Sequence, residues 1–238
     1  MGLAVLFPEG LGIAGASPKD ALEQLGSVTP TFAWAGSVLP GVPVRFTVQL
    51  ATDSALNNII LTDTASNASS LTIHVPLRPM PRLYWRVIAN GPAGLRRTTV
   101  VSGPLVMPRW AVLTTLNASG RSISNTERPT LRWNPLAVSP AVGPMLFDVQ
   151  ILDATGTVVP GETVSNIQSD SVKLPAPLDY NRDYSWRVIA KVGSIADTVT
   201  SLGTFIVTNS LHPPSTTLYQ NFPNPFPRPE LGARATRV

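Results

Sequence analysis

The sequence repeats itself once, with a period of about one hundred residues. The string Pro30–Trp34 (PTFAW) recurs as Pro129–Trp133 (PTLRW) in the second half. Three more blocks follow in the same order in both halves: Phe46–Leu50 with Phe147–Ile151, Ile73–Pro76 with Val172–Pro175, and Leu83–Ala89 with Tyr184–Ala190. Ordered blocks at a nearly constant offset indicate two homologous units in tandem.

Within the repeated blocks, apolar and polar residues alternate. Phe147, Val149 and Ile151 are separated by Asp148 and Gln150, as in a strand that buries one face. The sequence has 24 prolines and 17 glycines, which disfavour long helices and favour short strands joined by turns. Closing strands are expected at 103–107 and 203–207, after turns at 91–94 and 191–194. These features predict an all-β fold with two β-sandwiches.

Large aromatic residues recur at matching positions and are the expected core. A buried tryptophan removes on the order of 150 to 250 Å2 from water, so two in each unit would dominate its packing. The predicted core residues are Trp34, Trp85, Trp133, Tyr184 and Trp186.

The second half carries the pattern Leu131-x-Trp133-x-Pro135, then Phe147-x-Val-x-Ile, then Tyr184-x-Trp-x-Val. This pattern resembles a fibronectin type III domain, an Ig-like β-sandwich. The resemblance covers residues 26–108 and 109–208. It implies that Trp133 fills the core and that Tyr184 forms a corner hydrogen bond. In the first half Leu83 stands at the corner position and Tyr84 falls on the outward face.

Two arms flank the repeat. Residues 1–25 are interpreted as an N-terminal arm with a possible first strand, and residues 209–238 as a Pro-rich extended tail. The string Gln220–Phe226 (QNFPNPF) resembles the start of the C-terminal sorting domain of the type IX secretion pathway, and it then departs from that family at Pro227. The resemblance implies descent from an exported bacterial envelope protein. A signal peptide ending at Ala14–Ala16 is not favoured, because no basic residue precedes the apolar start.

Composition and charge exclude several classes of protein. The hydrophobic share of 43% is too high for intrinsic disorder. The net charge is +4, but Arg96 and Arg97 are the only adjacent basic pair, so nucleic-acid binding is not expected. Cysteine is absent, which removes disulfides and thiolate chemistry. No apolar run is long enough for a spanning helix of its own.

Catalytic equipment is sparse. His74 and His212 are the only histidines, so no triad or histidine-rich metal site is expected. The string Asp179–Asp183 looks like half of a calcium loop, but Arg182 stands where the turn glycine belongs, and Ala190 where the bidentate glutamate belongs. A polar turn is the favoured interpretation. We therefore expect no enzymatic activity, no metal and no cofactor.

Apolar loops and the arms are the candidate partner-binding segments. The alternative is that the loops only cap the sandwiches. The candidate residues are Val38, Leu39, Val42, Trp110, Leu136, Val138, Val142, Met145, Leu146, Tyr219, Phe222 and Phe226.

The sequence favours a non-catalytic, exported structural subunit, periplasmic or at the cell surface. It would be extrinsic to the membrane and would bridge proteins of a larger assembly, with a membrane-embedded complex as one form that this assembly could take. A carbohydrate-binding or adhesion module of a secreted surface protein is the alternative, with Trp110 as its one candidate aromatic platform. An accessory domain of a secreted enzyme is a third possibility.

Overall fold

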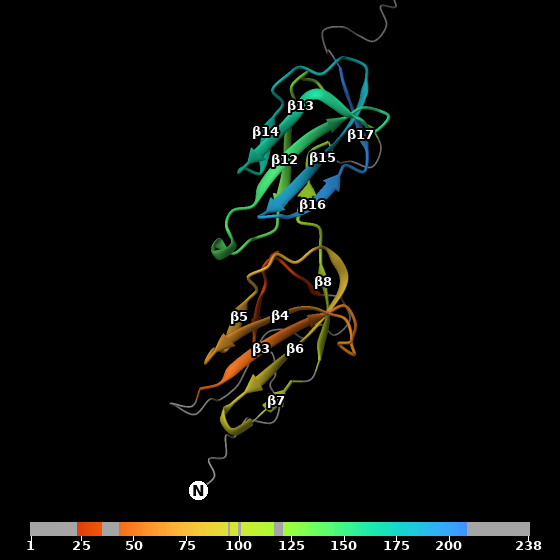
Figure 1. Ribbon diagram of the computed structural model, residues 1–238. Coiled ribbons are helices and arrows are strands. Elements are labelled where there is room, and N and C mark those ends of the chain that lie inside the picture. Colours follow the sequence, from red (N-terminus) through yellow and green to blue (C-terminus); the bar gives the residue numbers. More distant parts are fainter. Residues whose placement is uncertain (1–22, 35–42, 95, 100, 117–120, 209–238) are drawn as a thin grey trace, which may run out of the picture. The chain divides into compact units, whose positions relative to one another are not determined.

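The computed structural model describes residues 23–34, 43–94, 96–99, 101–116 and 121–208. This part of the chain is all-β, with only two short 3₁₀ helices (Figure 1). The expected fold class is therefore confirmed. No helix among the described residues is long and apolar enough to cross a membrane.

The first group of strands forms a large sheet in the order β1-β8-β6-β3-β4, with β7 added to β6, and a small sheet of β2 and β5. The strands are β1 (Glu23–Gln24), β2 (Thr31–Ala33), β3 (Arg45–Ala51), β4 (Ile59–Ser66), β5 (Ser70–Thr72), β6 (Met80–Asn90), β7 (Arg96–Thr98) and β8 (Ser102–Met107), and the 3₁₀ helix η1 spans Pro92–Gly94.

The second group repeats this arrangement, with a sheet in the order β10-β17-β15-β12-β13, β16 added to β15, and a small sheet β14-β11-β9. The elements are β9 (Ala111–Leu113), β10 (Arg121–Ser124), β11 (Thr130–Pro135), η2 (Pro140–Val142), β12 (Leu146–Leu152), β13 (Val158–Ile167), β14 (Ser171–Lys173), β15 (Asp183–Val192), β16 (Ile195–Thr200) and β17 (Thr204–Val207). The limits of the two sandwiches at residues 26–108 and 109–208 remain predictions.

The central strand pairs have the same register in both groups. Leu50 of β3 lies opposite Trp85 of β6, and Ile151 of β12 lies opposite Trp186 of β15. In both groups the first strand of the large sheet pairs in parallel with the last one, β1 with β8 and β10 with β17. The repeat seen in the sequence is therefore a repeat of strand pairing.

The predicted core residues are buried. The side chains of Trp34, Trp85, Trp133, Tyr184 and Trp186 are all at most 5% exposed.

The ring contacts also repeat. The rings of Trp34 and Phe46 lie 5.1 Å apart, and those of Trp133 and Phe147 lie 5.2 Å apart. Edge and tilted contacts of this kind add to the free energy gained by burying the rings.

The corner hydrogen bond expected at Tyr184 is present. The backbone amide of Asp179 donates to the Tyr184 hydroxyl oxygen at 3.2 Å. Leu83 occupies the corresponding place in the first group, where it is fully buried, and Tyr84 is partly exposed on the outward face.

Several strands were not expected from the sequence, among them β7 and β16 beside the central strands β6 and β15. Gly193, at a φ of 58°, makes a tight turn after β15, so that the chain returns at once as β16. The predicted turn at 191–194 is correct, but a six-residue strand lies between it and the closing strand β17. β7 occupies the corresponding place beside β6.

Candidate interaction surfaces

The apolar loop that joins β11 to β12 lies partly against the core. Leu136, Val138 and Val142 are half-buried and pack on core residues, and Met145 is buried. Ser139 caps η2 by accepting a hydrogen bond from the amide of Ala141. The apolar side chains of this loop thus contribute to packing, as in the capping alternative.

The same loop is hydrogen-bonded to residues 26–29. The amide of Val28 donates to the carbonyl of Ala137 at 2.9 Å, and the amide of Ala137 donates to the carbonyl of Gly26 at 3.2 Å. The amide of Ser139 donates to the Thr29 hydroxyl at 2.7 Å. Main-chain groups that an external partner would use are therefore already bonded within the chain.

The expectation that Trp110 forms an exposed aromatic platform is wrong. Its side chain is 0% exposed, and its indole nitrogen donates to the carbonyl of Leu77 at 2.8 Å. Its backbone amide donates to Asp197 Oδ2 at 2.8 Å, while Arg109 donates to Asp197 Oδ1 at 2.6 Å. Trp110 is a structural residue, because a buried indole with its N–H satisfied stabilises the fold.

Six of the other candidate residues lie outside the described residues: Val38, Leu39, Val42, Tyr219, Phe222 and Phe226. Leu146 is half-buried at the start of β12. The structure thus places only part of the predicted partner-binding set, and it buries much of that part.

The polar string Asp179–Asp183 borders a hollow of about 330 Å3 together with Asp153 and Tyr184. Asp179 is paired with Arg182 at 3.0 Å, and Asp183 is paired with Arg121 at 2.7 Å. Among the described residues no group of three or more histidine and acidic side chains is placed to hold a metal ion. The string forms a polar turn with internally paired charges.

An apolar groove that the sequence did not predict lies between β9 and β16. The groove has a volume of about 460 Å3, and Ala111, Leu113 and Val199 contribute to its lining. Val112 and Leu202 border it with side chains that are 57% and 87% exposed. Exposed apolar side chains that gather in a groove mark a candidate interaction site. The sequence offers no signal for this exposure, because Val112 stands in the apolar run Ala111–Leu113 and only the structure shows that its two neighbours are buried while it is not.

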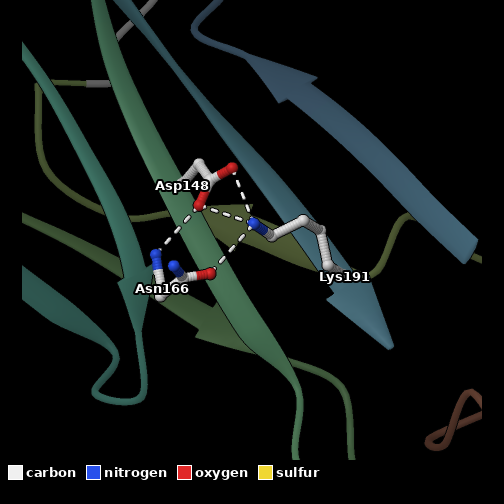
Figure 2. A network of polar contacts seen from close by, with 3 residues as sticks. All are labelled: Asp148, Asn166 and Lys191. Carbon is white, nitrogen blue, oxygen red and sulfur yellow. Dashed lines mark hydrogen bonds and ion pairs between the residues drawn. The ribbon is translucent and has the colours of Figure 1, made fainter. Parts of the chain in front are cut away.

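The outward face of the second large sheet carries a closed polar network (Figure 2). Lys191 of β15 reaches across to both carboxylate oxygens of Asp148 on β12, at 2.8 Å each. The backbone amide of Asn166 on β13 donates to Asp148 Oδ1 at 2.9 Å, and Lys191 Nζ also donates to the side-chain oxygen of Asn166 at 3.3 Å. Burial alone would raise the pKa of Asp148, but the hydrogen bonds from Lys191 and Asn166 outweigh it and hold that pKa below its ordinary value.

The outward face of each large sheet also carries a hydrogen-bonded arginine–glutamine pair. Arg86 Nε donates to Gln49 Oε1 at 2.8 Å, and Arg187 Nε donates to Gln150 Oε1 at 2.7 Å. The partners are 37 residues apart in both halves. The outward faces therefore share one pair, and they differ where the second has the Asp148–Lys191 network.

No protein-family model matches the sequence, and a search of curated proteins found no match. Among solved structures, the fibronectin(III)-like modules of Clostridium thermocellum CbhA are 15% identical over 85% of this chain and 96% of theirs, with a TM-score of 0.27. The FN1–FN3 domains of chicken CNTN1 are 16% identical over 85% of this chain and 67% of theirs, with a TM-score of 0.29. The BSP domain of a biofilm-associated protein is 13% identical over 82% of this chain and 30% of that one, with a TM-score of 0.26. At these scores the assignment of the fold rests on strand order, register and the buried aromatic residues.

Proposed function

We propose that this protein is a non-catalytic binding module built from two β-sandwiches, and that it holds other proteins of an exported, envelope-associated assembly together. The observation that carries this proposal is the groove between β9 and β16. The apolar side chains at its rim, Val112 and Leu202, are 57% and 87% exposed, so the fold leaves them available for contact with a partner. An export route and an extrinsic place at the membrane belong to the same proposal, and the resemblance of the tail at 220–226 supports them.

A protein partner is the occupant that this groove favours. Interface cores are depleted in charged residues, and the groove between β9 and β16 contains Arg109 as its one charged lining residue. The ion pair of Arg109 with Asp197 holds that guanidinium at 2.6 Å from the carboxylate. The remaining lining side chains are apolar or are threonines, Thr198 and Thr200.

Site-specific photocrosslinking tests the proposal. A photoreactive amino acid replaces Val112 in the full-length protein, which is expressed in its source organism and irradiated in intact cells. We expect a discrete adduct with an exported protein, and we expect Leu202→Glu to abolish it, because a carboxylate cannot be buried in an apolar contact without a large cost.

The control position is Ile123 of β10, which is 66% exposed and lies outside the groove. An equal adduct at position 123, or none at position 112, contradicts the proposed role of the groove. Fractionation of the same cells tests export, and a cytoplasmic location contradicts that part of the proposal.

The alternative, an adhesion module that binds carbohydrate, loses its aromatic platform with the burial of Trp110. Binding of a negatively charged carbohydrate is supported by a different observation, the arginines on the outward face of the first large sheet.

A further inference from the structure

The outward face of the first large sheet brings together three arginines that are far apart in the sequence. Arg45 of β3 lies opposite Asn90 of β6, and Asn90 lies opposite Arg96 of β7, so two of the arginines stand in one row across the sheet with Asn90 between them. Arg86 follows on β6, on the same face as Asn90, because residues four apart in a strand point to the same side. We call this surface the arginine face; its residues are Arg45, Thr47, Gln49, Thr64, Arg86 and Arg96.

Within the part of the chain that the structure describes, no acidic residue stands on the arginine face. The acidic residues that the structure describes in this half are Glu23, Asp53 and Asp63. Asp63 lies opposite buried Val48, on the core side, and is paired with His74 at 3.1 Å. Asp53 accepts hydrogen bonds from backbone amides of its own loop, and Glu23 is in β1 beyond β8.

The guanidinium groups of Arg45, Arg86 and Arg96 form no ion pair with an acidic residue that the structure describes. Arg45 and Arg96 are exposed, and Arg86 uses only Nε in its bond to Gln49. Among the described residues, no acidic side chain therefore occupies the terminal guanidinium nitrogens of this face, which can pair with an external anion.

The second half provides a matched comparison. The register places Leu146 and Ala196 where the first half has Arg45 and Arg96, on either side of Lys191. Lys191 in turn is neutralised by Asp148. One copy of the same sheet therefore carries an unneutralised basic face, and the other carries an internally paired one.

We propose that the arginine face binds an acidic polysaccharide, one whose repeating sugars carry carboxylate groups. Arginine pairs with carboxylates through two parallel hydrogen bonds. The hydroxyls of Thr47 and Thr64 and the amide of Gln49 add donors and acceptors for sugar hydroxyls.

The residues of the arginine face disfavour the other anionic partners. Among the described residues, Tyr84 of β6 is the one partly exposed aromatic side chain on this outward face, whereas protein interfaces and membrane-inserting surfaces concentrate several large exposed apolar and aromatic side chains. Arg45 and Arg96 are two strands apart, about 10 Å at the backbone, so separate carboxylates of one extended chain can reach them. This proposal does not depend on the groove between β9 and β16, so either can fail alone.

The test measures binding of alginate oligosaccharides to the full-length protein by calorimetry. The decisive variant replaces Arg45→Leu and Arg96→Ala, the residues that the second half carries. The control variant, Arg78→Ala with Arg132→Ala, loses the same charge at exposed positions away from this face. All four substitutions are at exposed positions, and unchanged unfolding midpoints verify that both variants fold.

We expect wild-type binding that weakens with added salt, a loss of about tenfold or more in the decisive variant, and less than about twofold in the control. Absence of binding, or an equal loss in the control, overturns the proposal. Equal binding of neutral dextran overturns the role of the carboxylates. Tighter binding of polyglutamate, or of phosphatidylserine vesicles, at matched charge overturns the polysaccharide as partner.

Discussion

The network of Asp148 and Lys191 allows a sharp test of the electrostatics. The first half has Thr47 and Asn90 at the matching positions, so the fold itself provides the neutral substitutes. We consider Asp148→Thr, Lys191→Asn and the double variant. Each single change leaves one charge on the sheet without its partner, whereas the double change removes both charges.

The expected coupling free energy follows from burial. The side chains of Asp148 and Lys191 are 18% and 29% exposed, with Nζ at 2.8 Å from the carboxylate. Exposed ion pairs contribute about 0.2 to 1 kcal/mol, and breaking a fully buried pair costs about 3 to 5 kcal/mol. A pair that is mostly but not fully buried should show a coupling of about 1 to 2 kcal/mol in a double-mutant cycle.

The direction of the pKa shift of Asp148 determines how the stabilisation by this ion pair changes with pH. The pKa of Asp148 is held below its ordinary value of 3.8 in the folded protein. The stabilisation is therefore fully present above that ordinary value and is lost as the pH falls through the lowered pKa. Urea unfolding of the four proteins at pH 7 and in a series of acidic buffers measures the cycle. Additive single effects at pH 7, or a coupling that persists after the carboxylate is protonated, would refute the reasoning.

Three further predictions concern the core. Trp133→Ala should cost about 3 to 5 kcal/mol in urea unfolding, and a cost below about 1.5 kcal/mol contradicts its place in the packing. Trp110→Phe should cost at least about 1 kcal/mol from the lost bond to Leu77, and a change in urea midpoint within error contradicts that bond. Burial raises the pKa of Glu162, and Arg128 only partly offsets this. Glu162→Gln should therefore stabilise the protein at pH 7, with the gain vanishing below the ordinary pKa of 4.5, and a gain that survives there contradicts the cause.

The fold could be predicted from the sequence because burial imposes periodicity. Trp186 and Val188 must share a face in any half-buried strand, and the repeat supplied the same pattern twice. Strand β16 was missed because its residues, such as Asp197 and Thr198, do not form an apolar stripe. Asp197 is buried for another reason: it accepts the amide of Trp110 and the guanidinium of Arg109.

The surfaces could not be predicted in the same way. Trp110 and Leu77 are 33 residues apart and meet only in the folded chain, so a lone tryptophan outside the repeat was mistaken for an exposed one. The arginines looked scattered because Arg45 and Arg96 become neighbours in a row only through the register of three strands. One signal was present: Gln and Arg recur at the same positions of both repeats, which places a polar pair on each outward face.

The contrast between the two outward faces bears on why the arginine face exists. Two positive charges about 10 Å apart in water repel by only about 0.4 kcal/mol before salt screening, so the fold tolerates Arg45 and Arg96. Exposed arginines without partners contribute almost nothing to stability either. Leu146 and Ala196 occupy the same places in the second half, so the sheet itself does not require a basic residue there. We infer that a requirement outside the folded chain accounts for the charge, and binding of the proposed acidic polysaccharide would be such a requirement.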